Sequence, residues 1–124
     1  MFKAILVDDE RMSLEVLAIK LRKLAPEMEI LATFQSSEEA VVGIRQLKPD
    51  VLFLDIEMPQ MNGFQVLETV GDIPFALVFV TAYDRFALKA FKYSALDYLL
   101  KPIDTQELIA TVHKIEKQRQ THHF

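Results

Sequence analysis

The sequence predicts one α/β domain with five β/α units, in which a doubly wound, flavodoxin-like parallel sheet has the strand order 2-1-3-4-5. Short apolar runs alternate with segments of helical periodicity along the whole chain. The apolar runs are almost continuous, as expected of strands that are covered on both faces. The chain has 124 residues, is 51% hydrophobic and contains no cysteine, which suits a single domain with its own core.

The first expected strand covers residues 3–7. Apolar residues then recur at helical spacing over residues 14–25, which predicts an amphipathic helix that Pro26 ends. Residues 30–34, which are mainly apolar, form the second expected strand. These three elements complete the first β/α unit and begin the second.

A capping box of Ser36 and Glu39 predicts the start of the second helix, which extends to Leu47 and is broken at Pro49. The third strand is expected at residues 51–54. It leads into a loop that ends at Asn62-Gly63, a pair typical of turns. A short helix through Phe64 and Leu67 should follow.

Residues 71–74 separate this helix from a fourth strand at 76–80. A helix over about 84–93 and a fifth strand at 98–100 come next. Asp104 and Glu107 predict the start of the last helix. The buried stripe of that helix is expected to consist of Leu108, Ile109, Val112 and Ile115.

Polar side chains follow four of the predicted strands. They are Asp8 and Asp9 after the first strand, Asp55 after the third, Thr81 after the fourth and Lys101 after the fifth. Parallel strands bring their carboxyl ends to one edge of the sheet, where ligands of such folds bind. We therefore expect three carboxylates, a hydroxyl and an ammonium to share one crevice.

This set of groups suits a divalent cation and a phosphoryl group. Clustered carboxylates repel one another, and Mg²⁺ prefers such oxygen ligands. We predict that Asp8, Asp9, Asp55 and the backbone carbonyl of Glu57 hold Mg²⁺. Asp55 is the expected nucleophile that forms an aspartyl phosphate. Lys101 would stabilise the charge of the transferring group, and the Thr81 hydroxyl would donate to the phosphoryl oxygens.

Each of these residues also has a simpler interpretation when it is taken alone. Asp8 or Asp9 could cap the following helix, Thr81 is a common residue at strand ends, and Lys101 could be a solvated surface lysine. Tyr98 is best interpreted as half-buried core. Taken together, polar groups at four strand ends are much less easily explained by chance than any one of them alone.

Composition excludes several classes of function. The net charge is −4 and no run of Lys and Arg is dense enough to follow a phosphate backbone, so we expect no nucleic-acid binding by this chain alone. No stretch approaches the roughly 20 apolar residues that cross a bilayer. We expect no membrane association and a cytoplasmic location.

The motifs together resemble the receiver domains of two-component response regulators. They are Asp8-Asp9, Asp55 with Met58-Pro59 and Gly63, Thr81-Ala82, and Tyr98 to Lys101-Pro102. The stretches Thr81 to Asp84 and Ala95 to Pro102 resemble the LytR/AlgR branch, whose members usually carry a C-terminal LytTR DNA-binding domain. The resemblance covers nearly the whole chain, and we expect residues 1–118 to form the receiver domain and 119–124 a polar tail or linker stump.

The resemblance implies a role for each matching residue. Asp55 would be the phosphoacceptor for a sensor histidine kinase. Asp8, Asp9 and the Glu57 carbonyl would bind Mg²⁺. Thr81 and Tyr98 would form the switch pair, and Lys101 would bind the phosphoryl group beside a cis bond to Pro102. The face built by the fourth helix, fifth strand and fifth helix, about Asp84 to Gln118, would form a homodimer and control transcription through a DNA-binding domain that this chain lacks.

Two rival functions belong to other classes. A small Mg²⁺-dependent phosphohydrolase would use Asp55 as a transient nucleophile and Glu57 as the general acid and base, although 124 residues leave little room for a substrate cap. A phosphate-independent interaction module would retain the acids only as architecture. The receiver is expected not to be an enzyme with an external substrate, but to assist its own phosphorylation and dephosphorylation.

Overall fold

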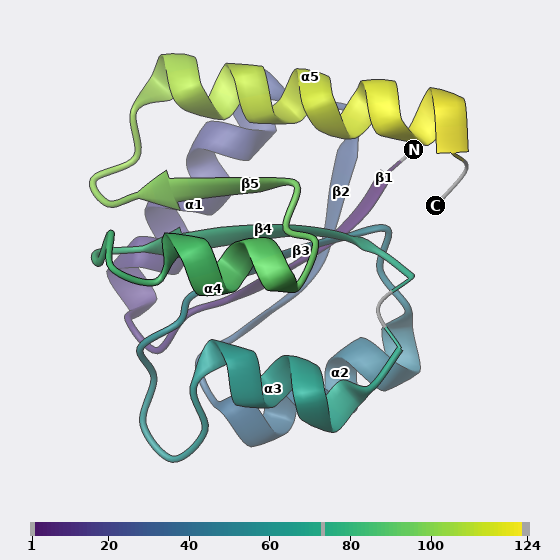
Figure 1. Cartoon of the computed structure of the whole chain (residues 1–124). Coiled ribbons are helices and arrows are strands. Elements are labelled where there is room, and N and C mark those ends of the chain that lie inside the picture. Colours follow the sequence, from purple (N-terminus) through teal and green to yellow (C-terminus); the bar gives the residue numbers. More distant parts are fainter. Residues whose placement is uncertain (1, 73, 123–124) are drawn as a thin grey trace.

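A computed structural model describes residues 2–72 and 74–122 and confirms the predicted fold: one sheet of parallel strands in the order β2-β1-β3-β4-β5 (Figure 1). Ile73 and the last two residues of the predicted tail lie outside this range. The strands are β1 (Phe2–Val7), β2 (Met28–Phe34), β3 (Val51–Leu54), β4 (Ala76–Thr81) and β5 (Asp97–Leu100). The helices are α1 (Arg11–Leu24), α2 (Ser37–Leu47), α3 (Gly63–Val70), α4 (Ala87–Lys92) and α5 (Thr105–His122).

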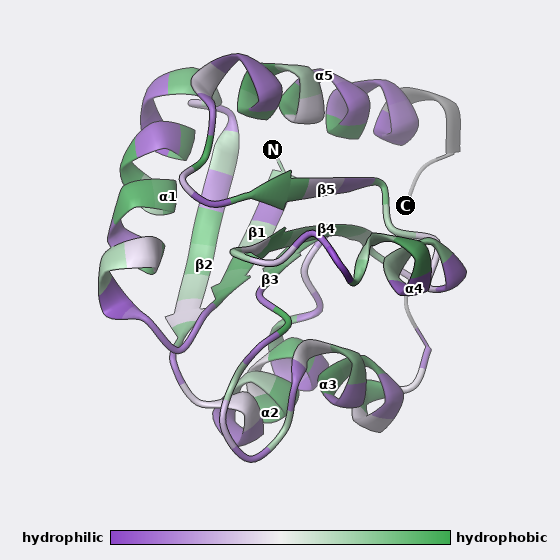
Figure 2. Cartoon of the chain, turned by 60° about the vertical axis from the view of Figure 1, so that its left-hand side comes forward, coloured by the Kyte–Doolittle hydropathy of each residue, from purple (hydrophilic) through white to green (hydrophobic). Residues whose placement is uncertain are grey.

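Helices cover both faces of the sheet. Residues of α1 and α5 pack with one set of strand side chains, which includes Leu6 and Phe53. Residues of α2, α3 and α4 pack with the alternate set, which includes Ile5 and Leu52. Figure 2 shows the central strands coloured mainly as hydrophobic, because consecutive side chains point to opposite, equally buried faces.

The register of the strands aligns the ends that carry the polar residues. Val7 of β1 pairs with Leu54 of β3, so Asp8 and Asp55 leave the sheet side by side. Thr81 pairs with Leu100, the residue before Lys101. The predicted convergence at one edge of the sheet therefore follows from backbone pairing.

Some local predictions were wrong. The fourth helix begins at Ala87, three residues later than predicted, after a loop that contains Asp84. Asn62-Gly63 does not form a turn; Asn62 caps α3 with a complete capping box to Gln65. By contrast, the structure shows only one half of the predicted box at Ser36, the bond that its side chain accepts from the Glu39 amide.

The last helix differs from the prediction in its buried stripe. Leu108, Val112 and Ile115 are buried as expected, whereas Ile109 is only partly buried. Thr111 is fully buried, and its hydroxyl is satisfied there because it donates to Asp97 at 2.6 Å. Helix α5 continues to His122, so part of the predicted tail is helical, and the boundary at residue 118 stays a prediction.

None of the described helices is long and apolar enough to cross a membrane.

Candidate functional site

Three acidic side chains meet at the carboxyl end of the sheet. One carboxylate oxygen from each of Asp8, Asp9 and Asp55 lies within 4.8 Å of the others. Asp8 and Asp55 are buried, and Asp9 is partly exposed. Asp8 and Asp9 precede α1 but do not cap it, because its N-cap residue is Glu10. The capping interpretation of these acids was therefore wrong.

Lys101, the residue after β5, binds this cluster. Its Nζ lies 2.7 Å from Asp8 Oδ2, 3.1 Å from Glu10 Oε1 and 3.2 Å from Asp55 Oδ2. Burial by itself would lower the pKa of the ammonium, but the hydrogen bond to Asp8 and the charge of Asp55 outweigh it and raise the pKa above its ordinary value. Lys101 therefore stays charged, and the interpretation of a solvated surface lysine was wrong.

The two acids after β1 have raised pKa values. Burial is the main cause at Asp8, whose pKa rises to about 6 although the hydrogen bond to Lys101 opposes the shift. Burial also raises the pKa of Asp9, and the charge of Asp55 adds to it. A single ammonium thus leaves excess negative charge at the site, which a divalent cation would neutralise.

Contacts on several sides hold the loop that follows Asp55. The Asp55 carboxylate accepts a hydrogen bond from the Ile56 amide at 2.7 Å. The buried Ser37 hydroxyl, at the start of α2, donates to the Met61 carbonyl at 2.6 Å. Gly63 packs directly on the Asp55 backbone, and a Cβ at this position would lie 2.4 Å from the Asp55 carbonyl oxygen. Only glycine allows α3 to begin so close to the acid.

Thr81 ends β4, whereas Tyr98 is the second residue of β5 and pairs with Phe79 rather than with Thr81. Thr81 is fully buried, and its hydroxyl accepts from the Tyr83 amide at 3.5 Å. Tyr98 is partly buried, and its hydroxyl donates to the Tyr83 carbonyl. The Tyr98 ring also packs against Phe79, with the ring centroids 6.2 Å apart. Tyr83 thus links the two residues of the predicted switch pair. The Lys101-Pro102 bond is cis, as the resemblance implied.

Glu57 is positioned by a contact that the sequence did not reveal. Its exposed side chain pairs with Arg85, with 3.7 Å between Oε1 and Nη2. The structure thus gives the Glu57 carboxylate a partner outside the acidic cluster. Its backbone carbonyl as a metal ligand stays a prediction.

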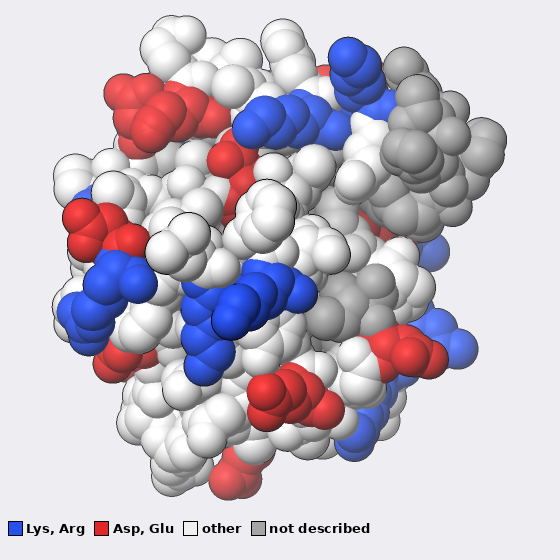
Figure 3. Space-filling model, in the orientation of Figure 1, with Lys and Arg blue, Asp and Glu red and all other residues white. Residues whose placement is uncertain are grey.

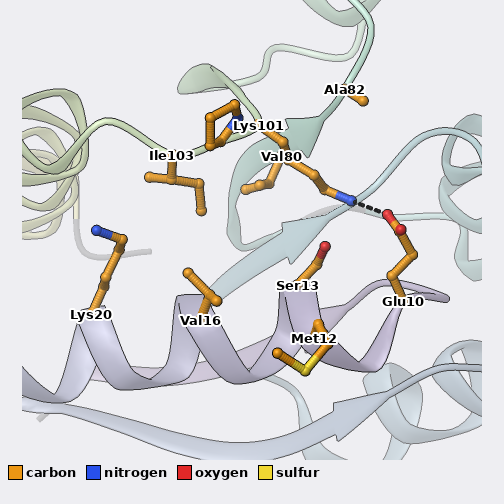
Figure 4. A pocket seen from close by; sticks show the side chains of 10 residues that line it. Glu10, Met12, Ser13, Val16, Lys20, Val80, Ala82, Lys101 and Ile103 are labelled. Carbon is orange, nitrogen blue, oxygen red and sulfur yellow. Dashed lines mark hydrogen bonds and ion pairs between the residues drawn. The ribbon is translucent and has the colours of Figure 1, made fainter.

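An open groove borders the site. It has a volume of about 570 Å³ and lies between α1, as far as Lys20, and the segments at the end of β4 and after β5. Figure 4 shows Lys101 and Glu10, joined by their ion pair, at one end of the groove, and Met12, Val16 and Ile103 along it. The groove gives a partner apolar surface next to the charged residues of the site.

The residues fit a magnesium ion. The cluster offers only oxygen donors, and two of its three acids are buried, which suits a hard cation that uses a few carboxylates and keeps several waters. The sequence correctly grouped the acids, Thr81 and Lys101 at one edge. It missed Glu10 as a partner of Lys101, Ser37 as a support of the loop and Arg85 as the partner of Glu57. No local pattern marks these contacts, because each joins residues that are distant along the chain.

Comparisons with known proteins agree with this geometry. The profile of the family described as response regulator receiver domain matches residues 4–113. An uncharacterized response regulatory protein of Vibrio cholerae is 45% identical over 95% of this chain, and the sensory transduction protein LytT of Bacillus cereus is 39% identical over 98%. The transcriptional regulatory protein BtsR of Salmonella typhi is 42% identical over 96%. Each match covers 50% of the relative, so the chain spans about half the length of these proteins.

Solved structures show the same fold. The response regulatory domain of mrkE from Klebsiella pneumoniae superposes with a TM-score of 0.88 at 27% identity, covering 97% of this chain and 99% of that one. The receiver domain of AraT, a response regulator from Geobacillus stearothermophilus, superposes with a TM-score of 0.80 at 31% identity, covering 96% of each chain. The similarity to LytT agrees with the predicted LytR/AlgR branch.

Proposed function

This chain belongs to the response regulator receiver family, and from that premise we propose that it is a cytoplasmic, Mg²⁺-dependent switch that accepts a phosphoryl group from a sensor histidine kinase onto Asp55. The observation that carries the proposal is the position of the Asp55 carboxylate. It is buried, borders Asp8 and Asp9, and has Oδ2 3.2 Å from the Lys101 ammonium. A nucleophilic carboxylate, oxygen ligands and a fixed cation are the groups that phosphoryl transfer needs.

In the proposed reaction an oxygen of Asp55 attacks the phosphorus of a phosphohistidine. The new P–O bond forms as the P–N bond breaks, and the imidazole leaves with the bonding electron pair. Lys101 stabilises the negative charge on the phosphoryl oxygens. Asp8, Asp9, Asp55 and the Glu57 carbonyl would hold Mg²⁺, which would supply further positive charge to the transferring group. Slow hydrolysis of this acyl phosphate would be the protein's own dephosphorylation.

The switch is proposed to act through the segment after β4. The Thr81 hydroxyl would donate to the new phosphoryl oxygens, which draws the following loop towards Asp55. Since the Tyr98 hydroxyl donates to the Tyr83 carbonyl in that loop, the movement changes the surroundings of Tyr98. The phosphoryl group can favour the active state only through contacts that differ between the two states.

The output face is proposed to form a homodimer. Leu88 and Phe91 of α4 are 87% and 82% exposed, which is unusual for large apolar side chains and marks an interaction surface. Figure 3 shows basic side chains over α4 and acidic ones over the start of α5. Lys89 and Lys92 belong to the first group and Glu107 to the second. A two-fold axis would bring α4 of one copy to α5 of the other, so that opposite charges meet.

Two partners complete the proposal. The groove beside Lys101 and Glu10 would receive the segment of the kinase that carries the phosphohistidine, because Lys101, which lines the groove, lies 3.2 Å from Asp55. The output would be transcription through a LytTR-type DNA-binding domain, since the curated relatives are about twice as long as this chain and one is named a transcriptional regulatory protein. The chain itself, with a net charge of −4, is expected not to bind DNA.

Incubation with acetyl phosphate and Mg²⁺ tests the proposal, with intact mass and oligomeric state recorded on the same sample. We expect the gain of one phosphoryl group together with dimerisation. Asp55→Asn should remove the mass gain and leave the fold intact. Asp72→Asn, which alters an exposed acid in the segment between α3 and β4, serves as the matched control and should be labelled normally. Stoichiometric labelling of the Asp55→Asn protein would overturn the assignment.

A turnover assay with an external phosphomonoester separates the rival phosphohydrolase from the receiver. That enzyme would turn over an external phosphomonoester with Glu57 as general acid and base. The Glu57 carboxylate pairs instead with Arg85, which supports the receiver. Multiple turnovers of p-nitrophenyl phosphate that are lost in Glu57→Gln would favour the rival.

A further inference from the structure

One arginine side chain joins the loops after β3 and β4. The Arg85 guanidinium lies 3.7 Å from Glu57 Oε1 on the loop after β3. Its Cζ also lies 4.5 Å from the centroid of the Tyr83 ring and 4.6 Å from that of Phe86, both on the loop after β4. The two rings pack edge to face, with centroids 6.2 Å apart. Arg85 is therefore held by its own loop on two sides and by the neighbouring loop on the third.

The residues that Arg85 contacts have direct links to the site. Glu57 lies two residues after Asp55, in the segment expected to bind Mg²⁺ through its backbone. The Tyr83 carbonyl accepts a hydrogen bond from the Tyr98 hydroxyl, and the Tyr83 amide donates one to the Thr81 hydroxyl. A movement of Thr81 towards Asp55 must therefore displace Tyr83 and, with it, the surface on which Arg85 stacks.

We propose that Arg85 is a positioning residue whose contacts with Glu57, Tyr83 and Phe86 hold the loop of residues 82–86 in its unphosphorylated position. This latch sets the fraction of the protein that is competent to bind a phosphoryl group. The inference rests on the proposed function and extends it, because it assigns a restraint on the switch to a residue outside the set of site residues.

The size of the effect follows from the exposure of the contacts. The side chains of Arg85 and Glu57 are 60% and 48% exposed, so the ion pair alone is weak. The two ring contacts add to it. Apparent affinity scales with the competent fraction, so loss of the latch should lower the apparent Kd of a phosphoryl mimic about fivefold.

Beryllofluoride with Mg²⁺ is a suitable probe, because it mimics the phosphoryl group without chemical turnover. We would titrate it into the wild type, Arg85→Ala and Glu57→Gln, and read the amide resonances of residues 82–86 by NMR. The same resonances in the free proteins give a second readout that needs neither metal nor mimic. Arg85→Lys retains the charge but loses the planar stacking group, so it should give an intermediate shift.

Arg11→Ala is the matched control. Arg11 pairs with Glu15 at 3.3 Å, the two side chains are 73% and 51% exposed, and the pair lies near the start of α1. The variant therefore removes one positive charge from a comparable exposed pair without freeing a loop after β4. Its apparent Kd should equal that of the wild type.

The signs of the two changes decide the proposal. A latch predicts that Arg85→Ala and Glu57→Gln both lower the apparent Kd. The double variant should lower it no further than Arg85→Ala does. The NMR spectrum of free Arg85→Ala should already be shifted towards the spectrum of the beryllofluoride-bound protein. Opposite changes in the two single variants would show a simple charge effect and overturn the latch, as would unchanged affinity. Failure of the wild type to bind beryllofluoride would instead reject the proposed function.

Discussion

The Lys101 ammonium lies closer to Asp8 than to the proposed phosphoacceptor: the distance from Nζ is 2.7 Å to Asp8 Oδ2 and 3.2 Å to Asp55 Oδ2. The same lysine therefore neutralises an acid that is expected to bind Mg²⁺ and one that is expected to bind the phosphoryl group. Because like charges repel, the ammonium and the cation oppose each other's binding while both favour the transfer of an anionic group.

Replacement of Lys101 should separate these two effects. Lys101→Met removes a positive charge next to the carboxylates, so we expect Mg²⁺ to bind up to about tenfold more tightly, about 1.4 kcal/mol. Acyl-phosphate formation should fall at least tenfold, because the phosphoryl oxygens lose their cation. Calorimetric Mg²⁺ titration and intact mass after acetyl phosphate treatment measure the two quantities. Weaker Mg²⁺ binding in a folded variant would contradict the competition.

Mg²⁺ affinity should depend on the protonation of Asp8. With a pKa of about 6, this acid must lose a proton before it can bind the ion, so the apparent affinity at pH 5 should be about tenfold lower than at pH 7. Affinity measured between pH 5 and pH 8 checks this. An equal affinity at both ends of that range would show that Asp8 is not a ligand.

The stability of the metal-free protein should change in the opposite direction. The pKa of Asp8 is about 6 in the folded protein and 3.8 for an unperturbed aspartate, so the folded state binds the proton more tightly. This contribution is complete below about pH 4 and is lost as the pH rises to about 6. Thermal unfolding in EDTA should reveal the loss, and Asp8→Asn should reduce it. Saturating Mg²⁺ should restore stability above pH 6.

Gly63 should be the least replaceable glycine near the site. In Gly63→Ala the new Cβ would meet the Asp55 carbonyl oxygen, a backbone atom that cannot rotate away, so we expect a loss of about 1–3 kcal/mol in the free energy of unfolding. Phosphoryl acceptance should also fall, since α3 must shift against Asp55. Gly43→Ala is the control, because the atoms nearest to its Cβ belong to the Phe34 ring, a side chain that can move, and not to the backbone. Urea unfolding of both variants provides the comparison.

Dimerisation should depend on the two large, exposed apolar side chains of α4, Leu88 and Phe91. Leu88→Ser and Phe91→Ser should leave monomer stability nearly unchanged, because these side chains contribute little to the core. Each should weaken the beryllofluoride-induced dimer by at least about tenfold, as expected of an apolar contact at the centre of an interface. Light scattering after gel filtration measures this. Val42→Ser, at an exposed position of α2, should dimerise like the wild type.

The sequence was most informative where the backbone pattern alone decides the position of a side chain. Each acid, hydroxyl or ammonium was expected at a strand end because apolar runs stop there, and parallel pairing places those ends together. The prediction that Asp8 and Asp55 are neighbours required only the strand order and the register Val7 to Leu54. Local boundaries were less predictable: the fourth helix was expected from about Asp84, but α4 begins at Ala87.

The amino-acid sequence by itself thus determined the alternation of strands and helices, the strand order and the identity of the groups at the crevice, because these depend on periodicity and on residue type. Only the tertiary structure decided how Lys101 is shared among three acids, why Gly63 must lack a side chain, and that Arg85 reaches Glu57. Those features depend on distances between residues far apart in the chain, and such distances are fixed only when the core packs and the loops take their places on it.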